Sequence, residues 1–127
     1  MVNLKKVARR NPQDATAPEK YYLQSVKTGL TDLERLAYLI SNQSTVRRPD
    51  CLAVLDALVH NMTDELAQGR VVQLGSLGNF QIGVRSIGAD TEDEVLISNL
   101  KSAHLNYRPG KVLKKALKVM DYQLITG

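Results

Sequence analysis

The chain has 127 residues, of which 43% are hydrophobic and 24% charged, a balance that excludes an extensively disordered protein. A single cysteine excludes an internal disulfide framework and a multi-thiolate metal site. The sequence also shows no nucleophile–base pairing and no phosphate-binding loop, so we expect no catalytic residue, bound metal or cofactor. The 17 Lys and Arg outnumber the 13 Asp and Glu, and the formal charge of +4 favours a polyanionic partner over a catalytic cleft.

The charge is divided unevenly along the chain. Residues 1–30 carry six bases and two acids, residues 31–84 four bases and six acids, and residues 85–127 seven bases and five acids. Basic ends therefore flank a less basic middle, as in many proteins that bind polyanions. No apolar run approaches the ~20 residues of a membrane span, and the N-terminus lacks a secretory signal pattern, so we expect a cytoplasmic protein without a membrane partner.

Residues 1–30 are predicted to form an N-terminal β extension. Two short strands are expected at 4–9 and 21–28, because residues such as Tyr21 and Tyr22 favour extended backbone. The intervening loop, residues 11–18, contains two prolines and several turn-forming residues. The extension should therefore be a strand pair with a long connection.

Two helices are expected next. Thr31 and Glu34 have the spacing of a capping box, which predicts a helix that ends in the polar stretch 41–45. A second helix should begin near Arg48–Asp50, where a proline suits the first turn, and should end before Gly69. Its apolar face is too wide for a single neighbour, which indicates packing on several elements or on a partner chain.

The remaining elements follow from alternating or helical spacing. They are strands at 70–74 and 80–84, an exposed loop at 86–94, a returning strand at 95–97 and 100–107, a third helix at 111–120 and a short strand at 122–125.

In this order of elements, four segments resemble the bacterial HU and integration host factor family of histone-like DNA-binding proteins. The matching segments are Leu55–Ala57, Gly69–Leu74, Leu77–Phe80 and Tyr107–Lys114. The resemblance covers about Thr31 to Met120, and the preceding residues resemble the N-terminal addition of extended HU-like variants.

The resemblance implies an α+β fold and an intertwined homodimer. Each chain would contribute a helical base of two helices, a three-stranded antiparallel sheet with a β-arm, and a C-terminal helix. Residues 31–127 would be an HU-like DNA-binding domain, and residues 1–30 an extra strand pair. Leu77, Phe80 and Tyr107 would lie in the dimer core.

The resemblance also implies a set of basic DNA contacts. Matched positions hold Arg85, Arg108, Lys111 and Lys114. Helical spacing adds Lys115 and Lys118 to these candidates, and the further basic candidates outside the matched positions are Arg9, Arg10, Arg47 and Arg48. Family arms usually end in an Arg-Asn-Pro tip whose proline wedges between base steps. The corresponding segment here contains four acids in Asp90–Glu94 and no proline, so bending by this arm is not expected.

Two of the basic pairs have alternative interpretations. Arg9–Gln13 contains an Arg-Asn-Pro string, which could form a groove-inserting wedge, although a turn begun by Asn11 and Pro12 is the simpler interpretation. Arg47 and Arg48 stand at the start of a helix, where cations are unfavourable, and could equally belong to an ordinary exposed turn.

The functional prediction is a nucleoid-associated, histone-like homodimer that binds double-stranded DNA with low sequence specificity. The alternative is an interaction module that keeps the HU fold for dimerisation and uses the acidic arm and N-terminal strands to bind protein. Neither function requires an enzyme, a cofactor or a small-molecule substrate. The acid run favours the alternative, whereas the basic third helix favours DNA binding.

Overall fold

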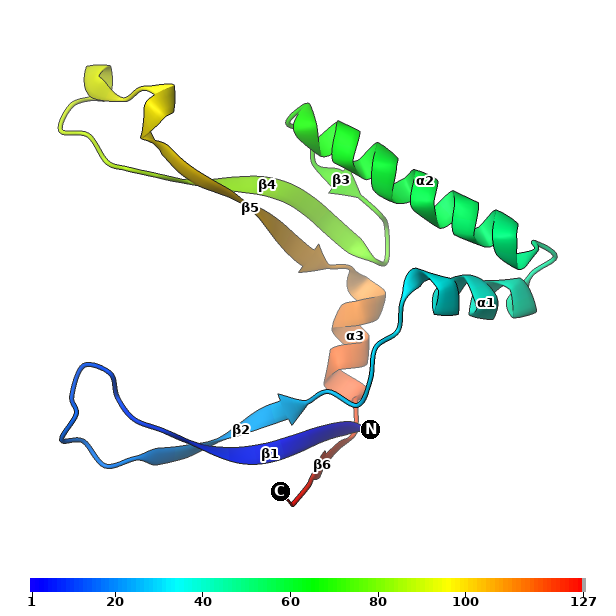
Figure 1. Ribbon diagram of the computed structural model, residues 1–127, viewed down its shortest axis with the longest axis horizontal. Coiled ribbons are helices and arrows are strands. Elements are labelled where there is room, and N and C mark those ends of the chain that lie inside the picture. The colour runs from blue at the N-terminus through cyan, green and yellow to red at the C-terminus, as the bar shows by residue number, and fades with distance from the viewer. Residues whose placement is uncertain (127) are drawn as a thin grey trace. The chain divides into compact units, whose positions relative to one another are not determined.

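The computed structural model of the chain describes residues 1–126 and shows a mixed α+β protein with two three-stranded sheets (Figure 1). The backbone contacts divide the chain into two units. One contains residues 1–32 together with the chain from Leu117 on, and the other contains residues 33–116. None of the described helices is both long and apolar enough to cross a membrane.

The sheet of the first unit has the strand order β2-β1-β6. Strand β1 (Val2–Arg9) runs antiparallel to β2 (Lys20–Val26), which confirms the predicted N-terminal strand pair. The sequence did not predict the pairing of the third strand. β6 (Tyr122–Leu124) lies parallel to β1, and the side chain of Gln123 donates a hydrogen bond to Asn3.

Helices α1 (Leu33–Gln43) and α2 (Arg48–Ala67) pack against each other in the second unit. Helix α1 begins after Asp32, so the predicted N-cap at Thr31 is wrong by one residue, but the helix ends at Gln43, within the polar stretch 41–45 that was expected to end it. Helix α2 begins and ends as predicted, with Gly69 in the left-handed conformation after it. Helical spacing and the residues near the helix ends therefore located both helices, with an error of one residue at the start of α1.

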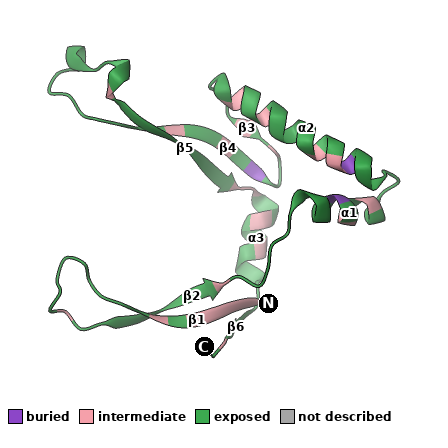
Figure 2. Ribbon diagram, in the orientation of Figure 1, coloured by how far each residue is buried: buried purple, intermediate pink, exposed green. Residues whose placement is uncertain are grey.

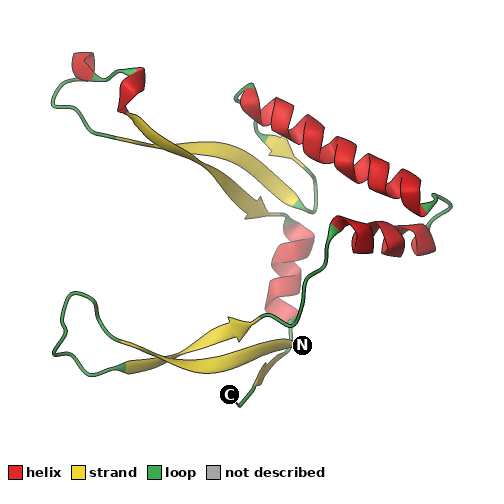
Figure 3. Ribbon diagram, in the orientation of Figure 1, coloured by secondary structure: helices red, strands yellow, loops and turns green. Residues whose placement is uncertain are grey.

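The second sheet is antiparallel throughout, with the order β3-β4-β5 (Figure 3). Strand β3 is limited to Val72–Gln73, whereas β4 (Gly78–Ser86) and β5 (Leu100–Pro109) form a long ladder with an irregularity between Arg85 and Ser86. The predicted strand at 95–97 is wrong. That region carries two short 3-10 helices, η1 (Glu92–Glu94) and η2 (Ile97–Asn99).

The Asn99 side chain explains this difference at the end of the hairpin. Its carboxamide oxygen accepts a hydrogen bond from the Leu96 N–H at 3.0 Å, and its amide nitrogen donates to the Ile87 carbonyl at 3.2 Å. These bonds satisfy backbone groups that a strand would have paired. The third helix, α3 (Lys111–Val119), follows β5 after Gly110.

A single chain buries very little hydrophobic surface (Figure 2). In the described part of the chain, Ala37 at 0% and Cys51 at 4% exposure are the only buried hydrophobic residues, and both lie where α1 meets α2. The alternating residues Phe80, Ile82 and Val84 share one face of the hairpin with Leu105 and Tyr107. Ile82 on this apolar face is 46% exposed.

Gly78 stands at the start of β4 in a conformation that other residues rarely adopt. Its φ is +130°, and a Cβ atom there would overlap the carbonyl oxygen of Arg108. Gly78→Ala should therefore lower the free energy of unfolding by about 2 to 4 kcal/mol, measured by urea denaturation. Gly75→Ala is the control, because Gly75 also has a positive φ of +56° but open space around its Cα, and its cost should stay near ~1 kcal/mol. Equal losses would contradict the role of the close approach.

Candidate nucleic-acid interface

The β4–β5 ladder separates its polar residues from its apolar ones. Residues paired directly across antiparallel strands point to the same side of a sheet. The face opposite Phe80 and Ile82 therefore carries the pairs Asn79–Arg108, Gln81–Asn106, Gly83–His104 and Arg85–Ser102. We call this the polar face of the hairpin.

The polar face places two of the predicted DNA contacts on one surface. Arg85 and Arg108 lie near opposite ends of it, and neither has an ion pair within the described residues. Between them, the side chains of His104 and Asn106 reach over Gly83, where a Cβ atom would overlap them. These two polar residues were not predicted as part of the site. Their alternation with Leu105 and Tyr107 along β5 could have indicated that they lie on the polar face.

Helix α3 presents four lysines on one side. Lys111, Lys114, Lys115 and Lys118 fall within an arc of about 100° at 3.6 residues per turn. All four are exposed, whereas Leu113 and Ala116 on the other side are partly buried. The helix is therefore amphipathic, with a continuous cationic stripe.

Gly110 links β5 to α3, and the turn before β4 packs against this link. The Gly110 N–H donates to the Leu77 carbonyl at 3.3 Å, and the Lys114 N–H donates to the Gly110 carbonyl at 2.9 Å. A Cβ atom at Gly110 would overlap the carbonyl oxygen of Ser76, so the chain can pass here only without a side chain. Arg108 and Lys111 are held three residues apart across this rigid junction.

The predicted dimer-core residues come together beside the same junction. The Tyr107 hydroxyl donates to the Leu77 carbonyl at 2.6 Å, and the Phe80 and Tyr107 rings have centroids 4.8 Å apart. Leu77 and Tyr107 remain exposed in the single chain. The group therefore forms an apolar surface next to the basic residues.

The end of the hairpin has the opposite charge. Asp90 and the three acids of η1 are exposed, together with apolar side chains such as Ile97. These carboxylates would be repelled by phosphates. The acidic end of the hairpin is therefore separate from the candidate DNA contacts on the polar face and α3.

The other predicted basic pairs have separate environments. Arg48 lies 3.4 Å from the Glu34 carboxylate and near the ring of Tyr38, which indicates a link between α1 and α2. Arg47 is exposed and precedes α2. Arg9 and Arg10 lie in the first unit, at the end of β1.

Comparisons with known proteins assign the chain to a family. A family model named HU-HIG, described as an HU domain fused to a wHTH, Ig or glycine-rich motif, matches residues 2–123. The chain belongs to the HU-HIG family. This HU-HIG chain is also 24% identical over 83 residues to DNA-binding protein HU of Thermotoga maritima, an alignment that covers 62% of this chain and 90% of that protein.

The HU-HIG chain also has a similar fold to a solved structure. The crystal structure is that of a candidate DNA-binding protein from Bacteroides vulgatus, with a TM-score of 0.69 and 16% sequence identity. The similarity covers 98% of this chain but 48% of the other, so the chain spans about half the length of that protein. At this level of identity the likeness shows the fold alone.

Proposed function

We propose that this HU-HIG chain is a nucleoid-associated, histone-like protein that binds double-stranded DNA as a homodimer. The observation that carries the proposal is the exposed lysine stripe of α3 and its rigid junction to Arg108 and the polar face. Residues 31–127 would form the DNA-binding region, with residues 1–30 as a separate β extension. This division remains a prediction, and β6 pairs with the extension.

The composition of the surface supports low sequence specificity. Lysine side chains contact phosphates, which position a protein on DNA but carry no base sequence information. The acidic end of the hairpin has no proline to insert between base pairs. We therefore propose that Arg85, Arg108 and the α3 lysines hold the phosphate backbone without an arm-tip wedge.

Exposed apolar surface supports the homodimer. Among the described hydrophobic residues, the chain buries only Ala37 and Cys51. The apolar face of the β4–β5 hairpin therefore has no element of the described chain packed against it. A second copy of the chain would cover such a face and supply the missing core. In this proposal Leu77, Phe80 and Tyr107 meet their counterparts in the partner.

A titration of short duplex DNA at two salt concentrations tests the DNA-binding proposal. Phosphate contacts release counterions, so the logarithm of the binding constant should fall by about 0.9 per contacted phosphate for each tenfold increase in salt. Six or more contacts predict a loss of about 10³-fold between 50 and 200 mM salt. Absence of binding at low salt would overturn the proposal.

The interaction-module alternative has less support than DNA binding. The acidic hairpin end is its main observation, whereas the family match and the basic α3 support DNA binding. We propose no catalytic activity and no small-molecule substrate, and a location in the nucleoid of the cytoplasm follows from the proposed partner.

A further inference from the structure

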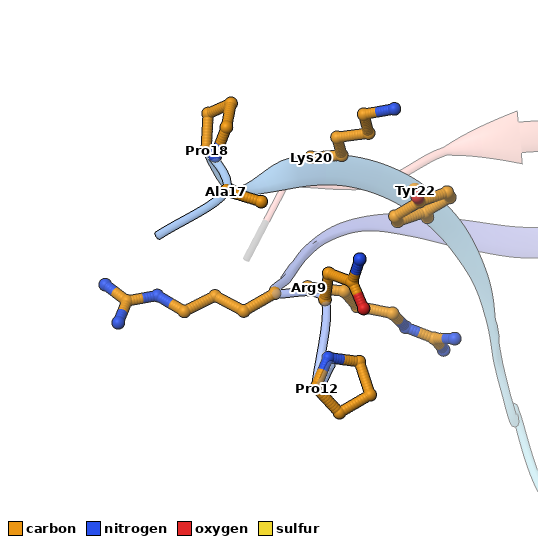
Figure 4. Close-up of a pocket in the computed structure, with 8 residues that line it drawn as sticks. Arg9, Pro12, Ala17, Pro18, Lys20 and Tyr22 are labelled. Atoms are coloured by element: carbon orange, nitrogen blue, oxygen red, sulfur yellow. The ribbon is translucent and has the colours of Figure 1, made fainter. Parts of the chain in front are cut away.

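The ends of β1 and β2 enclose a hollow of about 440 Å³ in the first unit. Figure 4 shows Arg9 and Pro12 along one side, and Ala17, Pro18, Lys20 and Tyr22 along the other. The volume falls in the range of about 300–1,000 Å³ that is usual for small-ligand sites. Every lining residue comes from the N-terminal hairpin.

Two cations without an ion pair occupy opposite positions in the strand ladder at this hollow. Arg9 and Lys20 are directly opposite in the β1–β2 ladder, so their side chains lie on the same face. Like charges in that position repel and destabilise a sheet. The nearby Glu19 carboxylate is 2.8 Å from Arg10, and neither Arg9 nor Lys20 has an ion pair among residues 1–126. A bound anion would relieve this repulsion.

An aromatic ring lies beside the two cations. Tyr22 is two residues from Lys20 on the same face of β2, and the Arg9 guanidinium lies 5.9 Å from the ring centroid. The tyrosine is 48% exposed, which leaves ring surface available to a ligand. A simple phosphate would use only the cations, whereas a nucleotide would use the cations and the ring together.

Hydrogen bonds within the connecting loop fix the shape of the hollow. The Asn11 side-chain oxygen accepts the Gln13 N–H at 3.0 Å, which is the turn interpretation of the Asn-Pro sequence. The Asp14 carboxylate accepts hydrogen bonds from the Thr16 hydroxyl at 2.6 Å and from its N–H at 3.0 Å. The hydroxyl and then the N–H of Thr16 lower the pKa of Asp14, so the anion that holds this turn persists in mildly acidic solution. A preformed site loses less conformational entropy on binding.

We infer that this hollow binds single-stranded nucleic acid, with a base stacked on Tyr22 and its phosphates beside Arg9 and Lys20. Cationic surfaces with exposed aromatic rings bind single strands because unpaired bases are free to stack on the rings. Bases inside a duplex are already stacked on their neighbours and cannot reach a ring on a sheet face. The inference concerns the β1–β2 hairpin, which contributes none of the residues of the proposed duplex site, and it does not depend on duplex binding.

Fluorescence anisotropy of the full chain with labelled oligothymidylate of about 12 nucleotides tests the inference. Tyr22→Ala should weaken binding by about 5- to 150-fold, the range expected for the loss of one stacked base. Tyr22→Phe, which keeps the ring, should bind as the wild type does. Arg9→Gln with Lys20→Gln should weaken binding and reduce its salt dependence.

Two matched controls come from the same unit. Tyr21 is the adjacent residue on the opposite face and is 72% exposed, so Tyr21→Ala should leave single-strand binding unchanged. Lys6→Gln with Lys27→Gln removes the same charge as the Arg9 and Lys20 double variant, with Lys6 on the opposite face. The inference would be overturned if Tyr21→Ala weakened single-strand binding as much as Tyr22→Ala does. It would also be overturned if the two double variants weakened single-strand binding equally.

Duplex DNA of the same length separates this site from the proposed duplex site. Tyr22→Ala should leave duplex affinity unchanged. The single-strand result can be interpreted even if the wild-type chain does not bind duplex DNA. An equal loss for duplex and single strand would overturn the inference, as would unchanged binding of Tyr22→Ala to the single strand. Circular dichroism and thermal unfolding check that the sheet remains folded, and retained binding by Tyr22→Phe together with loss in Tyr22→Ala assigns the effect to the ring.

Discussion

Ile82→Glu is expected to abolish the proposed homodimer. Ile82 lies on the apolar face of the β4–β5 hairpin, in register with Leu105 and on the same face as Phe80 and Tyr107. If a second chain covers this face, a glutamate there would be buried without a cationic partner, at a cost of several kcal/mol. Each dimer contains the change twice, so the dissociation constant should rise by about 10³-fold or more.

Sedimentation and thermal unfolding measure this effect. The wild-type chain should sediment as a dimer at micromolar concentration, and its unfolding midpoint should rise with protein concentration because dimerisation stabilises the folded state. Ile82→Glu should lose both properties. Gln81→Glu is the matched control, since Gln81 is the adjacent exposed residue on the polar face and receives the same added charge. A monomeric wild type, or a dimeric Ile82→Glu, would contradict the proposed interface.

Local sequence signals predicted most of the second unit. Pro49 and Gly69 bracket α2 because a proline fits a first helical turn and a glycine accepts the left-handed conformation after the last one. Alternation over Phe80, Ile82 and Val84 predicted β4 because a strand needs one apolar face. Both signals depend on neighbours within a few residues, and each element formed where the signal was present.

Contacts distant in the sequence could not be predicted in this way. Strand β6 pairs with β1 across more than a hundred residues, and Tyr122–Leu124 carries no local sign of its partner. Val95 and Leu96 favour a strand by composition and have extended backbone, but the Asn99 side chain accepts the Leu96 N–H and a 3-10 helix begins at Ile97, so no strand pairing forms there. The strand preference of these residues did not decide the local structure, because the Asn99 side chain accepts a backbone hydrogen bond that a neighbouring strand would otherwise accept.

The candidate site shows the same limit. Helical spacing alone predicts that the four α3 lysines share one side of the helix. The ion pair of Arg48 with Glu34 is a tertiary contact, however. Counting charges in the sequence could not show that Arg48 already has an acidic partner, whereas Arg85 and Arg108 have none among residues 1–126. His104 and Asn106 were likewise missed. Alternation within β5 places them opposite its apolar residues, but only the register shows that they lie between Arg85 and Arg108.

Lys111→Gln combined with Lys114→Gln is expected to weaken duplex DNA binding by about 10⁴-fold at 50 mM salt. The double variant removes two cations from the α3 stripe of each chain, and therefore four from a homodimer. If all four contact phosphates, the slope of the logarithm of affinity against the logarithm of salt should decrease in magnitude by about 3 to 4. Glutamine is also a good helix former, so α3 should remain intact.

The matched control is Lys6→Gln with Lys27→Gln, which removes the same charge from exposed positions in the first unit. Long-range attraction depends on the net charge of the whole molecule, whereas counterion release depends on which cations contact phosphates. The control should therefore change duplex affinity slightly and leave the salt slope nearly constant. A similar slope change in both double variants would mean that the loss reports net charge and that the α3 stripe is not the phosphate-binding surface.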